Sequence, residues 1–129
     1  PMADELKSIG FQSIQNPEDV KQALENAEGT TLLVVNSVCG CAAANARPGV
    51  RMALDQGKKP NHLVTVFAGV DTEATKMARN YLAPYPPSSP SIALFKDGKL
   101  VHFLERHNIE GKSAHIIANN LIDAFETFC

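Results

Sequence analysis

The feature that most constrains this chain is a pair of cysteines, Cys39 and Cys41, separated by a single glycine. An apolar run rich in β-branched residues, Leu32–Val35, precedes the pair and is typical of a buried strand. An alanine-rich stretch, Ala42–Ala46, follows the pair and is typical of the start of a helix. The sequence therefore places both cysteines at a junction where a strand ends and a helix begins.

This junction is suited to thiol chemistry. Unpaired N–H groups at a helix N-terminus carry partial positive charge, so we expect the pKa of a thiol there to fall below the free value of about 8.5. Gly40 lacks a Cβ and permits the tight turn that brings two thiols together at this spacing. A disulfide in so small a ring would be strained and easily reduced. The pattern indicates a redox-active pair; two inert cysteines or two metal ligands are the alternatives.

Composition limits the remaining choices. The 129 residues are 44% apolar and 20% charged, which predicts one globular domain spanning residues 1–129. A net charge of −2 favours neither nucleic acid nor an anionic membrane surface as a partner, and we find no apolar run near the roughly 20 residues of a membrane span. The absence of a secretory signal favours the cytoplasm, and this inference is weakened because Pro1 is not a native start. Three cysteines, an odd number, fit catalytic thiols in a reducing compartment better than a disulfide scaffold.

Hydrophobic periodicity and capping residues predict five helical segments. Asn16, Asp71 and Ser113 each precede a segment with a helical apolar face, and we expect each to act as an N-cap. The helix after Cys41 should bend at Pro48, which has no backbone N–H to donate. The helical segments are expected at residues 4–9, 17–27, 42–56, 72–82 and 114–128.

Short apolar or alternating runs predict five strands between these helices. Asp97-Gly98 predicts a hairpin between the last two strands, and the proline-rich residues 83–90 cannot be helical. The strands are expected at residues 11–14, 30–36, 63–68, 91–95 and 100–104. The resulting order β-α-β-α-β-α-β-β-α predicts an α/β, thioredoxin-like fold, with a central mixed sheet and helices on both faces. Ligands of such sheets bind outside the carboxyl ends of strands, where Cys39 and Cys41 fall.

Several segments also carry a family resemblance. They are Val34–Ala43, Ala46–Pro48, Thr65–Gly69, Pro87–Ser91 and Arg106–Gly111, together with the terminal Cys129. Over nearly the whole chain they resemble the bacilliredoxin family, thioredoxin-like proteins with a Cys-Gly-Cys site. This resemblance implies a thiol-disulfide oxidoreductase that removes bacillithiol from S-bacillithiolated protein cysteines, with weak disulfide isomerase or reductase activity.

The resemblance also implies roles for individual residues. Cys39 would be the attacking cysteine and Cys41 its neighbour, and Pro90 would be a cis-proline facing them. The backbone of Ser89 would then turn toward Cys39 and be free to pair with an extended substrate. We expect no bound cofactor and no metal, with bacillithiol or another low-molecular-weight thiol as co-substrate. The expected partners are S-thiolated cytoplasmic proteins, and the expected state is a monomer or weak homodimer.

The sequence differs from ordinary thioredoxins at three points that bear on its function. The cysteines are one residue apart, the chain has no Trp, and the strand before them, Thr31–Ser37, holds no carboxylate. These differences favour thiol transfer over dithiol reduction. An isomerase or reductase acting on protein disulfides is one alternative, and a metal carrier using Cys39, Cys41 and Cys129, across a dimer if necessary, is the other.

The sequence leaves the roles of two residues, Cys129 and Arg47, undecided. Cys129 is either a free surface thiol or a resolving or dimer-forming cysteine. Arg47 is either a solvated surface group or the partner of a thiolate or carboxylate.

Overall fold

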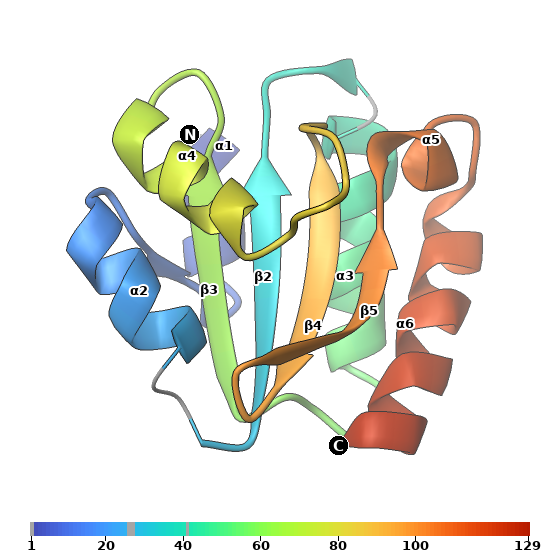
Figure 1. Ribbon diagram of the computed structural model, residues 1–129. Helices are drawn as coiled ribbons and strands as arrows, with labels where there is room; N and C mark the ends of the chain where they lie inside the picture. The colour runs from blue at the N-terminus through green and yellow to red at the C-terminus, as the bar shows by residue number, and fades with distance from the viewer. Residues whose placement is uncertain (1, 26–27, 41) are drawn as a thin grey trace.

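A five-stranded mixed sheet forms the centre of the protein (Figure 1), whose computed structural model describes residues 2–25, 28–40 and 42–129. The strands lie in the order β1-β3-β2-β4-β5, with β2 parallel to β3 and antiparallel to β4. This arrangement confirms the predicted mixed sheet. The strands are β1 (Gln12–Ser13), β2 (Thr30–Asn36), β3 (His62–Phe67), β4 (Ser91–Lys96) and β5 (Lys99–Leu104).

Helices cover both faces of the sheet, as predicted. Figure 1 shows α2 and α4 on one face and α3 and α6 on the other. The central strand β2 is buried along its whole length, so its alternate side chains serve two cores: Leu32 and Val34 pack on the α3 and α6 side, Leu33 and Val35 on the α2 and α4 side. The α-helices are α1 (Met2–Lys7), α2 (Pro17–Glu25), α3 (Arg47–Leu54), α4 (Thr72–Asn80), α5 (Arg106–Ile109) and α6 (Ala114–Phe128).

Two of the three predicted N-caps are confirmed. The side chain of Asn16 accepts a hydrogen bond from the Asp19 N–H at 3.0 Å, and that of Ser113 accepts one from Ile116 at 3.2 Å. Asp71 does occupy the N-cap position of α4, but the prediction that its side chain caps the helix is wrong. Its carboxylate instead accepts from the backbone N–H of Phe67, at 3.2 Å. The carboxylate therefore braces the loop before α4.

The helix after the cysteines differs from the single bent helix that the sequence predicts. Residues Ala42–Ala46 form a π-helical segment, η1, and α3 then runs from Arg47 only to Leu54. Pro48 has no N–H to donate, and its ring would clash with the carbonyl four residues earlier in a regular α-helix. A wider turn just before Pro48 removes that conflict, and the bend expected at Pro48 stays a prediction.

Other local features follow the sequence more closely. Asp97 and Gly98 both have positive φ, 49° and 82°, as the hairpin between β4 and β5 requires. Residues 83–90 form neither helix nor strand. Helix α5 was not predicted, because four residues are too few to show a hydrophobic period. Within the described residues, no helix is both long and apolar enough to cross a bilayer.

Candidate active site

Cys39 follows just beyond the carboxyl end of β2, where the sequence places it, and Figure 1 shows that end of the strand. Its side chain is partly exposed, and the preceding Val38 is 67% exposed. The Ala42 N–H donates to the Cys39 carbonyl at 3.1 Å, which holds the start of η1 against the cysteine turn. Cys41, the second predicted cysteine, lies outside the described residues.

Ser37 makes the most direct contact with the cysteine. Its hydroxyl donates a hydrogen bond to Cys39 Sγ at 3.3 Å and accepts one from the Cys39 backbone N–H at 3.3 Å. A hydrogen bond donated to sulfur favours the thiolate over the thiol, because the charged form is the better acceptor. Ser37 was not predicted from the sequence as a site residue, although a hydroxyl two residues before a cysteine is typical of a local turn.

A buried arginine stands behind this turn. Arg47, 4% exposed, donates through Nη1 to Asn36 Oδ1 at 2.9 Å and to the Ser37 carbonyl at 3.1 Å. Its Nε donates to Glu5 Oε2 on α1, also at 2.9 Å. Of the two readings of Arg47, the structure therefore supports the carboxylate partner. Asn36 Oδ1 also accepts from the Ser37 N–H at 2.9 Å, so the bonds form one chain from Glu5 to Cys39.

The loop that contains Ser89 and Pro90 lies beside the cysteine turn. Ser91 pairs with Val35 in the sheet, so the two preceding residues of the loop adjoin the end of β2. The Ser89–Pro90 peptide bond is cis, as expected. The Ser89 carbonyl accepts a hydrogen bond from Arg106 Nη1 at 3.3 Å, and the pairing of this backbone with an extended substrate stays a prediction.

The segment 106–112 joins this loop to the helix after the cysteines. Besides binding Ser89, Arg106 donates its backbone N–H to Ser88 Oγ at 3.3 Å. Asn45, on η1, donates to the carbonyl oxygens of Ile109, at 3.3 Å, and Lys112, at 2.5 Å. Asn45 and Arg106 were not predicted as site residues, because the groups that they bind here are distant in the chain.

Gly40 sits in open space. A Cβ added there would meet no atom within 4 Å, and its φ lies outside the left-handed region. The structure thus shows no steric conflict that demands glycine at this position. The predicted turn that joins two thiols involves Cys41 and stays a prediction.

Cys129 lies far from Cys39. It follows the 15-residue helix α6, which is about 22 Å long, and Figure 1 shows the C-terminus at the opposite end of the sheet from the tip of β2. It is exposed there, so it cannot resolve an adduct on Cys39 of the same chain in this conformation. A dimer-forming role for Cys129 stays a prediction. Among the described residues, no group of three His, Cys, Asp or Glu side chains could hold a metal ion.

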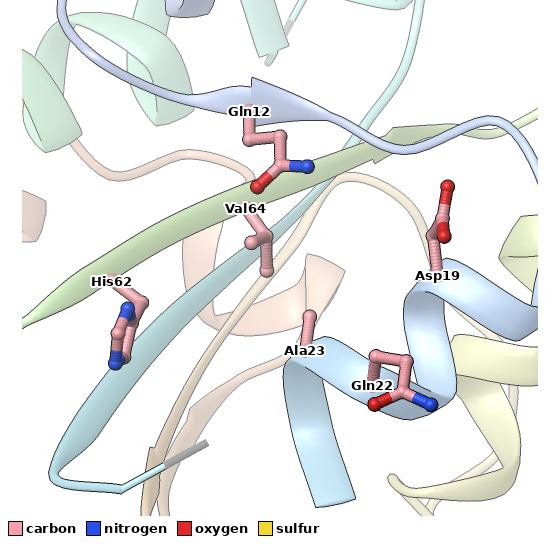
Figure 2. Close-up of a pocket in the computed structure, with 6 residues that line it drawn as sticks. All are labelled: Gln12, Asp19, Gln22, Ala23, His62 and Val64. Carbon is pink, nitrogen blue, oxygen red and sulfur yellow. The ribbon is translucent and has the colours of Figure 1, made fainter. Parts of the chain in front are cut away.

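A separate pocket of about 320 Å³ opens between α2 and the β1 and β3 edge of the sheet. In Figure 2 the side chain of His62 lies near one end of the pocket and that of Asp19 near the other. The His62 ring contacts the Glu28 carbonyl at 3.1 Å. The lining contains no thiol and belongs to the other end of β3 from the cysteine turn. The residues that line it are Gln12, Asp19, Gln22, Ala23, His62 and Val64.

Comparison with known proteins finds relatives that match this chain over most of their own length. The protein family described as "Disulphide isomerase" matches residues 1–129. A bacilliredoxin of Cytophaga hutchinsonii is 60% identical over 121 residues, which cover 94% of this chain and 89% of that protein. A bacilliredoxin of Halalkalibacterium halodurans is 54% identical over 129 residues, which cover 100% of this chain and 90% of that protein.

Solved structures show the same fold at low sequence identity. Mitochondrial thioredoxin 3 of Saccharomyces cerevisiae superposes with a TM-score of 0.60 at 14% identity, covering 95% of this chain and 98% of that chain. Thioredoxin of Malassezia sympodialis gives a TM-score of 0.60 at 15% identity, covering 92% and 90% respectively. The fold is therefore that of thioredoxin. The family match, the relatives and the partly exposed cysteine all agree. The chain belongs to the bacilliredoxins of the disulphide isomerase family and is a thiol-disulfide oxidoreductase.

Proposed function

We propose that the protein removes a small thiol, bacillithiol or a close analogue, from S-thiolated protein cysteines through a Cys-Gly-Cys site. Cys39 is the attacking residue in this proposal and Cys41 the second cysteine. The observation that carries the proposal is the partly exposed Cys39 at the carboxyl end of β2, with the Ser37 hydroxyl bonded to its sulfur. The bacilliredoxin relatives support a small thiol as the group that is moved.

The first step is a thiol-disulfide exchange. The Cys39 thiolate attacks the sulfur of the small thiol in the mixed disulfide, and a bond forms between these two sulfurs. The original S–S bond breaks, and its electron pair stays on the cysteine sulfur of the substrate protein. That sulfur takes a proton from solvent, so the substrate leaves reduced. The small thiol remains on Cys39.

The second step restores Cys39. A second small thiol, as thiolate, attacks the sulfur of the bound one; the two leave as a disulfide, and Cys39 departs as thiolate. Alternatively, Cys41 attacks the Cys39 sulfur and releases the small thiol, which leaves an internal disulfide for an external thiol to reduce. Cys129 takes no part in either route, because it lies at the opposite end of the sheet.

Apolar side chains beside the cysteine provide a surface for the substrate protein. Val38 is 67% exposed and Val70 is 70% exposed. They follow the ends of the neighbouring strands β2 and β3, where Asn36 pairs with Phe67. Exposed apolar groups at the same edge as a reactive thiol are suited to transient contact with a protein surface.

Single-turnover mass spectrometry tests the proposal. Cys41→Ala, mixed with an S-bacillithiolated protein, should release the reduced protein and retain one bacillithiol adduct on Cys39. Cys39→Ala should leave the substrate modified. Cys129→Ser serves as the matched control and should behave as the parent protein does. A lasting mixed disulfide between the Cys41→Ala variant and the substrate protein, as the dominant species, would contradict the proposal.

Disulfide isomerisation is the second candidate, favoured by the description of the matching family. It uses the same attack by Cys39 but on a disulfide between two protein cysteines. The discriminating assay offers the enzyme a protein with scrambled disulfides and no small thiol. Recovery of native disulfides at a rate that matches de-thiolation would favour the isomerase.

A further inference from the structure

We propose that Arg47 is a positioning residue of the active site, which acts through Asn36 and Ser37 to hold the Ser37 hydroxyl against Cys39 Sγ. Glu5 on α1 is the group that in turn holds Arg47. This role of Arg47 rests on the proposed function in one respect, since both take Cys39 as the thiol that reacts.

The burial of Arg47 is the starting point. A guanidinium that is 4% exposed must find acceptors inside the protein, because its desolvation is otherwise costly. Its rigid fork meets acceptors on three separate residues: Glu5 Oε2, Asn36 Oδ1 and the Ser37 carbonyl. A lysine carries the same charge, but it lacks the planar fork that reaches several acceptors in fixed directions.

The bonds of Arg47 converge on Ser37. Nη1 binds the Ser37 carbonyl directly at 3.1 Å, and it binds Asn36 Oδ1, which accepts the Ser37 N–H at 2.9 Å. Both backbone polar groups of Ser37 are therefore tied to one side-chain network. With this backbone fixed, the hydroxyl stands 3.3 Å from both Sγ and N of Cys39.

Glu5 extends the network to the N-terminal helix. Its carboxylate lies 2.9 Å from Arg47 Nε, and the next residue, Leu6, is fully buried in the core below α3 and α6. The packing of Leu6 therefore sets where the carboxylate stands. Helix α1, more than thirty residues before the cysteine, thus supports the active site.

Two physical accounts of this arrangement predict opposite results for Glu5→Gln. If Arg47 acts by position, a neutral amide holds the guanidinium less firmly, and alkylation of Cys39 at pH 7 should slow by about twofold to threefold. If Arg47 acts by its positive field, removal of the opposing carboxylate should strengthen that field and speed alkylation. Glu5 is 32% exposed, so the substitution leaves no fully buried group unpaired. We expect the slower reaction.

A double-mutant cycle tests whether the effect passes through Ser37. Arg47→Lys keeps the charge but loses the fork, and it should slow alkylation of Cys39 about fivefold to tenfold and move the midpoint of its pH profile upward. In the Ser37→Ala background the same substitution should add little, because the group that Arg47 positions is already gone. Rates are read from the Cys39 peptide by mass spectrometry, with Cys129 of the same molecule as reference.

Arg51→Lys is the matched control, since Arg51 lies one turn further along α3 and is exposed. It should leave the alkylation rate and the pH profile of Cys39 unchanged. An unchanged or faster rate in Glu5→Gln, or additive effects in the Arg47→Lys and Ser37→Ala cycle, would overturn the inference. Because the probe is a simple alkylating agent, the result stands whatever small thiol the enzyme moves.

Discussion

The Ser37 hydroxyl lies 3.3 Å from Cys39 Sγ and equally far from the Cys39 backbone nitrogen. The second bond matters because it restrains a hydroxyl that would otherwise rotate freely. The strand before this cysteine holds no carboxylate, and a neutral hydroxyl donates a hydrogen bond to the sulfur. A hydroxyl donates a hydrogen bond to the thiolate, whereas an ionised carboxylate can only accept, and would take the proton of the thiol.

Removal of this hydroxyl should make Cys39 less reactive. Ser37→Ala deletes the hydrogen bond to sulfur, so alkylation of Cys39 at pH 7 should slow about threefold to tenfold, with the midpoint of the pH profile raised. The alkylation rate is measured by quenching the reaction at successive times and quantifying the modified Cys39 peptide by mass spectrometry. Cys129, at the far end of the molecule, should react as before. Equal slowing at both cysteines would point instead to a general effect of the substitution.

Two glycines should differ in how much stability the protein loses when each is replaced by alanine. A Cβ at Gly49 would stand 2.7 Å from Ile117 Cγ2, so Gly49→Ala should push α3 from α6 and destabilise the protein by about 1–3 kcal/mol. The sign of this stability change is informative, because replacement of glycine by alanine ordinarily stabilises an exposed helix interior. Gly40→Ala, in open space, should stay within about 0.5 kcal/mol of the parent. Urea unfolding measures both; a stabilised Gly49→Ala would contradict the close packing of the two helices.

Tyr81 should titrate at unusually high pH. Its hydroxyl donates to Glu25 Oε2 at 2.7 Å, and this bond, with smaller contributions from burial and from the charges of Glu25 and Glu18, raises the pKa of Tyr81 from 10.0 to about 12. Because the folded pKa lies above the unfolded one, the stabilisation is complete below pH 10 and is lost as the pH rises through about 12.

The tyrosinate absorbance checks this value. The difference between the parent protein and Tyr81→Phe isolates the titration of Tyr81. Glu25→Gln should bring the midpoint back toward 10.0. A midpoint that does not move in Glu25→Gln would show that the carboxylate is not the cause.

The exposed valines should matter for protein substrates alone. Val70→Ser removes an apolar side chain that is 70% exposed beside the cysteine turn, so KM for an S-thiolated protein should rise about threefold to tenfold. Turnover of a small mixed disulfide should be unaffected, because it does not need this surface. Ile116→Ser on α6, at a side chain that is 55% exposed, is the control. Equal losses on both substrates would contradict a docking role.

The fold could be predicted from sequence because its strongest signals are local. The apolar run in β2, the caps Asn16 and Ser113, and the Asp97-Gly98 turn each act within a few residues. The capping role of Asp71 was predicted wrongly because an Asp before a helix can bond backward as well as forward, and here it binds Phe67. The local sequence does not determine which of these two hydrogen bonds Asp71 makes.

The candidate site could be predicted only in part, because several of its contacts join residues that are far apart in the sequence. The cysteine position followed from the strand and helix around it. The partners of Arg47 did not, since Glu5 lies 42 residues away and Asn36 lies on another element. Arginine is usually solvated, so only the packed structure reveals a buried one. Asn45 and Arg106 were not predicted either, because the side-chain bonds that tie them to the site end on backbone carbonyls, which leave no sequence signal.

The π-helical segment Ala42–Ala46 fixes the angle at which the next helix presents its side chains. A π turn holds one residue more than an α turn, and each residue of an α-helix advances the side chains by about 100°. Loss of a single alanine from this run would therefore rotate the start of α3 relative to the cysteine turn and carry Arg47 away from Asn36. The number of residues in this short stretch therefore helps to determine where Arg47 lies relative to the cysteine turn.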